Sequence, residues 1–367
     1  MYKVLMICCL DINEKGGGGF ECQKRNYLAL QNFFGEKNVE FFYIYKYYLG
    51  YSIKHKPIKK INLMIEKPYG LCTKNEKFIL EKMYEKDVIF IERSLYGRLA
   101  KLIKNKCPQK KVIIFFQNVE FFYQRQERTN FLGRFIMEKL AFNNETIACR
   151  YSDSIICLNS RDAKQIEQLY HRKADAIIPI SFPNREIRFS QEKIKAVPTA
   201  LFFGSNFFSN IHGIKWFIEN VLPYVNINLT VAGNNMDKAN LPESKKLQVM
   251  GYVENIDEYM QDADFMILPI FQGSGMKVKT CDALMHGKNI IGTREAFEGY
   301  EVDFAKVGAC CETEEEFIEA INEFPKKFTH KFNEYSRGVF LEKYSNDITF
   351  GQFADVFKNQ SVGKLER

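Results

Sequence analysis

Short, unbroken runs of apolar residues alternate with longer amphipathic segments in the first half of the chain. The runs cover residues 2–10, 39–45, 88–92, 111–116, 154–158 and 176–180, and each is expected to form a strand. Runs that are apolar throughout are typical of strands covered on both faces of a parallel sheet. Helices are predicted between them, at residues 22–34, 75–84, 97–105 and 161–169. This half is therefore predicted to be a doubly wound α/β domain.

The second half of the chain repeats the same alternation. Strands are predicted at residues 200–203, 228–232, 247–250, 265–270 and 289–292, and helices at 213–221, 256–263 and 279–285. The tail from residue 314 onward has a helical pattern. Prolines bracket the polar stretch 184–195, which is predicted to be an interdomain linker. Because 367 residues exceed what one hydrophobic core usually serves, two α/β domains are expected.

Composition limits the cellular and chemical setting. Hydrophobic residues make up 46% and charged residues 26% of the chain, as in globular proteins. No segment approaches the roughly 18 uninterrupted apolar residues that span a bilayer, so any membrane contact is expected to be peripheral. The ten cysteines are scattered through apolar runs, which indicates reduced core residues in a cytoplasmic protein. The five histidines are too far apart to form a local ligand cluster, so no metal is expected.

The net charge of +7 comes partly from two lysine-rich stretches, residues 54–60 and 101–111. A solvated surface explains them, and attraction to anionic lipid or to a polyanionic substrate is the alternative. Nucleic acid is not expected as a partner, because no helix-turn-helix, RNA-binding sheet motif or zinc-finger spacing accompanies the charge.

Glycine, positive charge and a predicted helix start coincide in residues 269–287. The glycines at 273 and 275 leave backbone N–H groups open, and a helix N-terminus adds about half a positive charge. Lys277 and Lys279 supply full charges, and Asp282 on the first helical turn is expected to accept hydrogen bonds from a ribose diol. The segment therefore predicts a diphosphate site. A Gly-Ser turn followed by two solvated lysines is the alternative.

Two further strands of the second half end in glycine and polar residues. They are followed by Gly204-Ser205-Asn206 and by Gly233-Asn234. Ligands of open α/β sheets bind beyond the carboxyl ends of strands, which makes these residues candidates for the same site. Ordinary turn chemistry explains each of them equally well.

Several segments together resemble a known family. They are residues 15–20, 117–120, 158–162, 178–182, 203–206, 269–287 and 298–300. Because these segments occur together and in this order, the chain resembles the retaining glycosyltransferases of family 4 (glycosyl transferases group 1), in their bacterial polysaccharide-building branch. The resemblance implies the GT-B fold, in which two Rossmann-like domains have parallel sheets that face each other across a cleft.

The resemblance also implies a separate role for each domain. Residues 1–180 would bind the acceptor, residues 181–339 would bind the nucleotide-sugar, and a C-terminal helix of about residues 340–367 would pack back on the first domain. No metal and no cofactor are implied, since the nucleotide-sugar is a substrate. Catalysis would consist largely of positioning and charge stabilisation as the diphosphate departs.

Specific residues carry the implied donor site. The diphosphate would face Gly275, Met276 and Lys277, the ribose Asp282, and the base Tyr252 and Val253. The full set of expected donor-binding residues is Gly18, Gly19, Gly204, Ser205, Asn206, Gly233, Tyr252, Val253, Gly273, Ser274, Gly275, Met276, Lys277, Lys279 and Asp282. Gly18 and Gly19 would close over the phosphate from the first domain.

The expected catalytic residues are Lys277, Asn118 and Glu120. Asn118 and Glu120 follow the predicted strand 111–116, where Glu120 would act as a base or would orient an acceptor hydroxyl; a plain surface position is the alternative. The aromatic run 121–123, with arginines at 125 and 128, would meet a lipid-linked acceptor or pack in the core.

The chain departs from the family pattern at three points. The family pairs two glutamates with seven residues between them, whereas here Asp282 stands at the second and Ser274 or Gln272 near the first. Gln117 stands where related chains tend to carry histidine, and glutamine is not a titrating base. Lys277 and Lys279 would replace an arginine and lysine pair that the family usually supplies from the Gly204 loop and the helix after it.

The expected function is hexosyl transfer from a uridine diphosphate sugar, with a guanosine diphosphate sugar as the alternative donor. The acceptor would be a glycan or lipid-linked glycan in cell-surface polysaccharide assembly, at the cytoplasmic face of an anionic membrane. Two other functions stay open, namely a non-catalytic partner subunit with this fold and a sugar-nucleotide epimerase.

Overall fold

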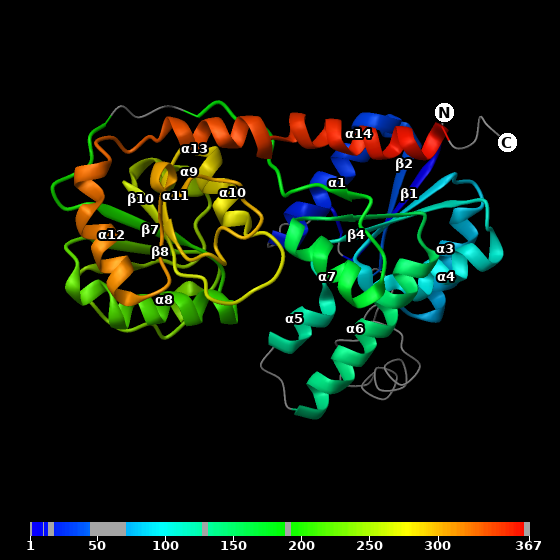
Figure 1. The fold of residues 1–367 in the computed structure, drawn as a ribbon, viewed down its shortest axis with the longest axis horizontal. Helices are drawn as coiled ribbons and strands as arrows, with labels where there is room; N and C mark the ends of the chain where they lie inside the picture. The colour runs from blue at the N-terminus through cyan, green and yellow to red at the C-terminus, as the bar shows by residue number, and fades with distance from the viewer. Residues whose placement is uncertain are drawn as a thin grey trace. The chain divides into compact units, whose positions relative to one another are not determined.

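The computed structural model describes residues 2–9, 11–13, 18–44, 71–126, 131–187 and 192–362, with side chains up to residue 358. The chain divides into two compact units (Figure 1). The N-terminal unit comprises residues 1–179 and 349–367, and the C-terminal unit comprises residues 180–348. Each unit contains one six-stranded sheet in which all paired strands are parallel.

The strand order of the N-terminal sheet is β2-β1-β3-β4-β5-β6. The strands are β1 (Val4–Cys8), β2 (Val39–Tyr43), β3 (Val88–Glu92), β4 (Lys111–Phe116), β5 (Ser154–Cys157) and β6 (Ala176–Ile177). Every residue of β1 and β3 is buried, as the unbroken apolar runs predict. In register, Val4 of β1 lies opposite Val39 of β2 and Val88 of β3.

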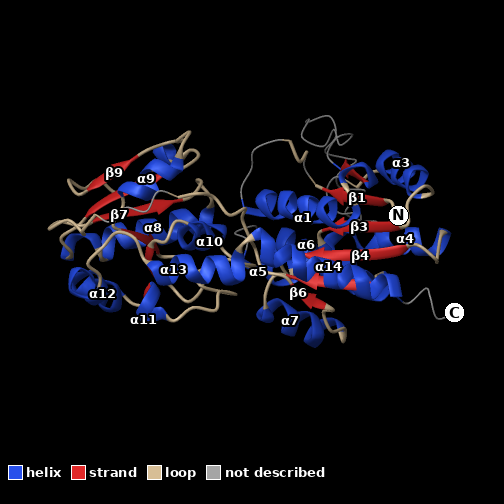
Figure 2. Ribbon diagram, turned by 90° about the horizontal axis from the view of Figure 1, so that it is seen from above, coloured by secondary structure: helices blue, strands red, loops and turns tan. Residues whose placement is uncertain are grey.

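Helices cover both faces of this sheet (Figure 2). The helices of this unit that precede residue 179 are α1 (Gly18–Phe34), α3 (Thr73–Met83), α4 (Gly97–Lys106), α5 (Glu120–Gln126), α6 (Phe131–Tyr151) and α7 (Ser160–Tyr170). Helix α1 begins four residues before the predicted start. Helices α5 and α6 are absent from the sequence-based prediction.

The end of the chain packs on the N-terminal sheet. Helix α14 (Asn346–Val362) places the Phe353 ring 6.5 Å from the Phe90 ring and 6.3 Å from the Phe115 ring. The Arg25 guanidinium lies 5.2 Å from the centre of the Phe353 ring, and its Nη1 donates to the Pro179 carbonyl at 2.6 Å. These contacts make residues 349–367 part of the N-terminal unit.

The strand order of the C-terminal sheet is β12-β11-β10-β7-β8-β9. The strands are β7 (Thr199–Phe203), β8 (Asn228–Ala232), β9 (Leu247–Val249), β10 (Phe265–Leu268), β11 (Asn289–Gly292) and β12 (Gly308–Cys310). The helices are α8 (Phe208–Asn220), α9 (Ile256–Asp262), α10 (Val278–Met285), α11 (Phe304–Val307), α12 (Glu314–Lys327) and α13 (Glu334–Val339). Both sheets confirm the predicted α/β class with parallel strands.

Residues 184–187 and 192–195, the described parts of the stretch expected to be an interdomain linker, are counted with the C-terminal unit. Arg337 Nη2 donates to Asn184 Oδ1 at 2.5 Å and to the Arg185 carbonyl at 3.1 Å. Lys331 Nζ lies 2.5 Å from Glu192 Oε2. The prolines near this segment mark irregular backbone, but a buried arginine and lysine attach that backbone to the unit.

Some predictions lie outside the described residues. They concern the lysines of residues 54–60, the glycines at 16 and 17, and Arg128. The ten cysteines are all described, and no disulfide bond joins any two of them. Within the described part of the chain, no helix is both long enough and apolar enough to cross a bilayer.

Candidate functional site

The C-terminal sheet reverses its strand order between β7 and β10. Chain connections leave these two neighbours in opposite directions, and ligands of open α/β sheets bind beyond the carboxyl ends of such a pair. The segment after β7 begins with Gly204, and the segment after β10 is the glycine-rich stretch 269–277. The predicted diphosphate segment therefore lies at the switch point of the sheet.

Two glycines bring the backbone close together at this edge. A Cβ on Gly213 of α8 would lie 1.7 Å from the Pro269 carbonyl oxygen, and one on Gly233 would lie 2.0 Å from the Gly204 carbonyl oxygen. Gly233 also has a φ of +138°, which side-chain-bearing residues rarely adopt. Glycine is therefore required at both positions. Gly213 lets α8 approach the loop after β10, and Gly233 lets the loop after β8 approach the loop after β7.

The segment after β10 is shaped by two more glycines with positive φ. Gly273 has a φ of +153° and Gly275 a φ of +59°. Lys277 then occupies the N-cap position of α10, and its carbonyl accepts a hydrogen bond from the Tyr300 hydroxyl at 2.8 Å. Tyr300 is buried, so the start of α10 is fixed from inside the unit. A helix N-terminus held behind a glycine turn favours an anionic group.

The Lys277 ammonium is enclosed by acceptors. Its Nζ lies 2.7 Å from Glu295 Oε1, and it donates to the carbonyls of Gly275 at 3.2 Å and Ser274 at 3.4 Å. The Lys277 side chain is only 11% exposed, and that of Glu295 18%. Sequence reasoning missed Glu295, which follows β11 and is brought to Lys277 only by the pairing of β10 with β11.

The Lys279 ammonium lies at the end of β7. Its Nζ donates to Asn210 Oδ1 and lies 4.8 Å from the centre of the Phe202 ring. A Cβ on Gly204 would come within 3.1 Å of it. Burial and the neighbouring charge of Lys277 lower the pKa of Lys279 to about 7. The structure therefore brings both predicted lysines to the switch point, with Lys277 against Glu295 after β11 and Lys279 against Phe202 of β7.

Asp282 belongs to a charged group on the same helix. Its Oδ1 lies 3.3 Å from Nδ1 of His286, and Nε2 of His286 lies 3.1 Å from Oδ1 of Asp257 on α9. Burial alone would lower the pKa of His286, but the carboxylates of Asp282 and Asp257 raise it above its ordinary value. The predicted ribose-binding carboxylate is thus held by a buried histidine that sequence reasoning did not select.

The remaining predicted donor residues of this unit lie on the neighbouring strand ends. Ser205 and Asn206 are exposed, and Asn206 Nδ2 donates to the Asn235 carbonyl at 3.1 Å. Tyr252 and Val253 follow β9, where Gly233 N donates to the Gly251 carbonyl at 3.1 Å. Tyr252 is 63% exposed. The predicted donor residues of the C-terminal unit therefore follow the carboxyl ends of β7, β8, β9 and β10, except Lys279 and Asp282, which lie on α10.

In the N-terminal unit, Gly18 and Gly19 are exposed and open α1. Gln117 Nε2 donates to the Gly19 carbonyl at 3.0 Å and to Glu92 Oε1 at 2.8 Å. Asn26 Nδ2 donates to both oxygens of Glu92, at 3.0 and 2.9 Å. Glu92 is fully buried at the end of β3, and burial raises its pKa. Gln117 thus fixes the start of α1 through its amide.

Glu120 is buried and is the first residue of α5. Its backbone N–H donates to Glu145 Oε1 at 2.8 Å, and its Oε2 accepts from Gln124 Nε2 at 3.4 Å. Glu145 also accepts from the hydroxyls of Ser94 and Tyr170, and burial raises its pKa to about 7. Asn118, just before α5, is half-buried. The α5 start is therefore fixed by a buried carboxylate.

The aromatic run after Glu120 contributes to packing. Phe121 and Phe122 pack against the hydrophobic core of the N-terminal unit, and Tyr123 is half-buried. Phe121 additionally contacts the small cluster of Leu95, Leu140 and Ala141. These contacts correspond to core packing, which is one of the two roles considered for this run.

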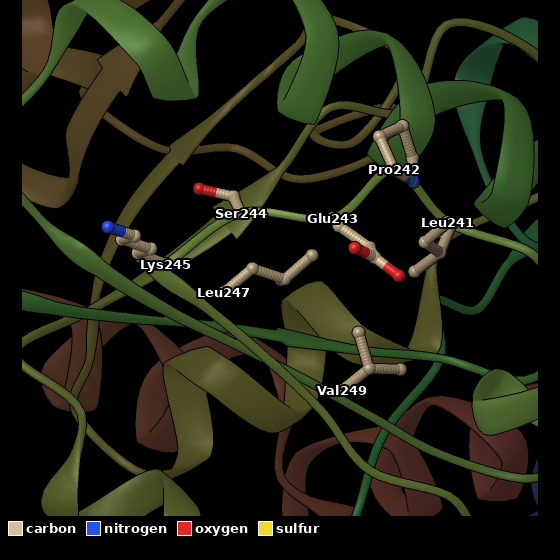
Figure 3. Close-up of a pocket in the computed structure, with 7 residues that line it drawn as sticks. All are labelled: Leu241, Pro242, Glu243, Ser244, Lys245, Leu247 and Val249. Carbon is tan, nitrogen blue, oxygen red and sulfur yellow. The ribbon is translucent and has the colours of Figure 1, made fainter.

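A surface hollow of about 530 Å³ lies beside the edge strand β9 (Figure 3). Its lining residues are Leu241, Pro242, Glu243, Ser244, Lys245, Leu247 and Val249. None of them is a predicted donor residue, so the hollow is separate from the switch point. Elsewhere in the described residues, no three His, Cys, Asp or Glu side chains come together in a way that would hold a metal ion.

Comparison with known families identifies the segment that contains the switch point. Residues 197–326 match the family model described as Glycosyl transferases group 1. This match confirms the expected glycosyltransferase, and it includes Lys277, Lys279, Asp282 and Glu295. No curated protein matches the chain.

Solved structures resemble the whole chain at low sequence identity. The complex of Anabaena Alr3699/HepE with UDP-glucose has a TM-score of 0.68 and 12% identity, over 98% of this chain and 100% of that one. The α,α-trehalose-phosphate synthase (UDP-forming) from Burkholderia xenovorans has a TM-score of 0.63 and 10% identity, over 97% and 100%. TarM has a TM-score of 0.61 and 10% identity, over 97% and 99%. These similarities confirm the expected GT-B fold.

Proposed function

We propose that this protein is a retaining hexosyltransferase of family 4 that takes its sugar from a nucleoside diphosphate sugar. One observation carries the proposal. Lys277 and Lys279 both lie at the switch point of a sheet whose sequence matches a glycosyltransferase model, beside a glycine turn and a helix start. Two ammonium groups and backbone N–H groups at one place suit a diphosphate leaving group, whose developing charge they would stabilise.

A UDP-sugar is the favoured donor, with a GDP-sugar as the alternative. The HepE structures were determined with UDP and with UDP-glucose, and the trehalose-phosphate synthase carries the description UDP-forming. Tyr252 and Val253 would contact the base and Asp282 the ribose. In this proposal lysines neutralise the charge of the diphosphate, so the reaction needs no metal and no cofactor. Turnover would then be unchanged when a chelator is added.

The proposed acceptor is a glycan or lipid-linked glycan in cell-surface polysaccharide biosynthesis, at the cytoplasmic face of a membrane. The N-terminal unit would bind it, with Asn118 near the reacting hydroxyl and Gly18 and Gly19 closing on the donor phosphate. Glu120 stays a candidate for orienting that hydroxyl, although its side chain is buried.

The test starts with thermal shifts of the purified protein across nucleotide-sugars, because a ligand that binds only the native state raises the melting temperature. Donor turnover is then measured with the stabilising compound. Lys277→Ala is expected to lower turnover about 100-fold or more. The control is Lys215→Ala, which removes an exposed lysine paired with Glu219 on α8 and should leave turnover unchanged.

Each outcome is informative. Donor binding without turnover would favour a non-catalytic partner subunit, which the Gln117 amide makes the second candidate, because it is engaged with Glu92 and does not titrate. Conversion of the donor sugar without any acceptor would indicate an epimerase. Equal turnover in Lys277→Ala and Lys215→Ala would reject the proposed site.

A further inference from the structure

Four large apolar side chains lie exposed on the first turns of α6. Phe131 is 77% exposed, Leu132 67%, Phe135 57% and Ile136 39%. They are spaced as two pairs four residues apart, so they are neighbours on one helical surface. Single exposed apolar residues are normal, but a contiguous group indicates an interaction site. We call these four residues the α6 tip.

Among the described residues of the N-terminal unit, the hydrophobic clusters do not include the α6 tip. The inner face of α6 is supplied by Leu140 and Ala141, which are buried against Leu95, with Met137 and Phe121 packed on this cluster. Figure 1 shows α5 beside α6, and the first turns of α6 lie away from the strands of the unit. The helix therefore has one face that the fold requires and another that the fold leaves exposed.

Cations surround the α6 tip. The Arg134 guanidinium lies 5.9 Å from the centre of the Phe131 ring, and the exposed Lys139 follows on the next turn. Arg125 of α5 lies nearby, and both arginines approach Glu138, at 3.6 and 3.3 Å. Two arginines share one carboxylate and Lys139 adds a further positive charge, so the described charged groups at the tip are mainly cationic, in a chain of net charge +7.

We propose that the α6 tip docks on the surface of an anionic lipid bilayer. Phenylalanine, leucine and isoleucine would enter the boundary between headgroups and acyl chains, while the arginines and Lys139 would contact anionic headgroups. A second copy of the chain is a weaker occupant, because pairing two tips would bring like charges together.

This inference rests on the proposed function only in so far as the acceptor of that function is linked to a lipid. Docking itself is measured without donor or acceptor, so a failure of docking and a failure of glycosyl transfer are distinguishable. The measurement is co-sedimentation of the full chain with phosphatidylcholine vesicles, with and without phosphatidylglycerol. The wild-type chain is expected to sediment mainly with the anionic vesicles, and added salt should weaken this binding by screening.

The variant that tests the surface is Phe131→Ser with Phe135→Ser. Both side chains are exposed, so the variant is expected to keep the wild-type melting temperature, and its partition onto anionic vesicles should fall about tenfold or more. The control is Tyr224→Ser, which removes an aromatic ring that is 70% exposed in the C-terminal unit and should leave the partition unchanged.

A second variant locates the contact directly. Phe135→Trp keeps an aromatic group at the tip and adds a fluorophore to a chain whose own tryptophan is Trp216. Vesicles should shift the added emission to the blue. Three results would overturn the proposal. The first is equal sedimentation of the serine variant and the wild type with anionic vesicles. The second is vesicle binding of Phe135→Trp without any emission shift. The third is a dimer in solution that the serine substitutions dissociate, with no vesicle binding by either protein.

Discussion

Lys277 Nζ lies 2.7 Å from Glu295 Oε1, and this pair joins the loop after β10 to the loop after β11. The lysine that is expected to neutralise the donor diphosphate therefore has a carboxylate partner in this structure. A diphosphate would share Lys277 with Glu295, and the negative charge of Glu295 would oppose its binding.

Glu295→Gln is accordingly expected to tighten UDP binding, by about three- to tenfold, because the substitution removes a negative charge from the site and keeps the side-chain shape. Isothermal titration with UDP checks this. Glu301→Gln is the matched control, since Glu301 is 79% exposed and pairs with Lys343. Weaker UDP binding in Glu295→Gln would mean that Glu295 is needed to hold Lys277 in place.

UDP binding should take up a proton near neutral pH. Burial lowers the pKa of Lys279 to about 7, and a nearby diphosphate would favour its charged form. Above pH 7 the free protein must gain a proton to bind, so UDP affinity should fall as the pH rises. At pH 8, which is above the phosphate pKa of about 6, the uptake belongs to the protein.

The measurement is titration calorimetry of UDP in two buffers of different ionisation enthalpy. The wild type should show an uptake of up to about one proton at pH 8, and Lys279→Met should lose that uptake together with the pH dependence of affinity. Lys215→Met serves as the control. An uptake that persists in Lys279→Met would assign the proton to another group.

The pKa of His286 predicts a pH-dependent contribution to stability. Asp282 and Asp257 raise this pKa above its unfolded value of about 6.5, so the folded state binds protons more tightly. The stabilisation is complete below the unfolded pKa and is lost as the pH rises through the folded pKa. His286→Gln should therefore lower the melting temperature more at pH 5.5 than at pH 8.5.

Thermal unfolding across this pH range provides the test, with the exposed His330→Gln as the matched substitution. An equal loss at both pH values would show that His286 acts in the fold only by packing and neutral hydrogen bonds.

Gly213 should be intolerant of a side chain, whereas Gly338 should accept one. A Cβ on Gly213 would lie 1.7 Å from the Pro269 carbonyl oxygen, and one on Gly338 of α13 would meet nothing within 4 Å. Gly213→Ala is expected to destabilise the unit by about 1–3 kcal/mol, and Gly338→Ala to stabilise it by up to about 1 kcal/mol through helix propensity. Denaturant unfolding of both variants checks the pair. Similar stabilities would contradict the close approach of α8 to the β10 loop.

Local patterns predicted much of the fold. The bounds of β3, β4, β8 and β11 agree with the predicted runs, because each run is mostly apolar and has a polar residue or glycine at or next to its ends. Helix α6 escaped prediction for a physical reason. It is apolar on an inner face that packs against Leu95 and again at the exposed tip, so no single amphipathic stripe marks it.

The part of the site that is formed by residues close together in the sequence was predictable. The part that is formed by contacts between separate strands and helices was not. Gly275, Lys277 and Lys279 lie within one turn and one helix start, so their clustering is visible in the sequence. Glu295 reaches Lys277 only when β10 pairs with β11, and His286, which is four residues after Asp282, reaches Asp257 only when α9 packs beside α10. No spacing rule encodes such contacts, since they depend on the register of separate elements.

The most direct test of the account is a crystal structure of the chain with UDP. The prediction is that diphosphate oxygens lie within about 3 Å of Lys277 Nζ and of the backbone N–H groups at the start of α10, with Lys279 adjacent. Nucleotide bound instead in the hollow beside β9, or a switch point that stays closed by the Lys277–Glu295 pair at saturating UDP, would contradict it.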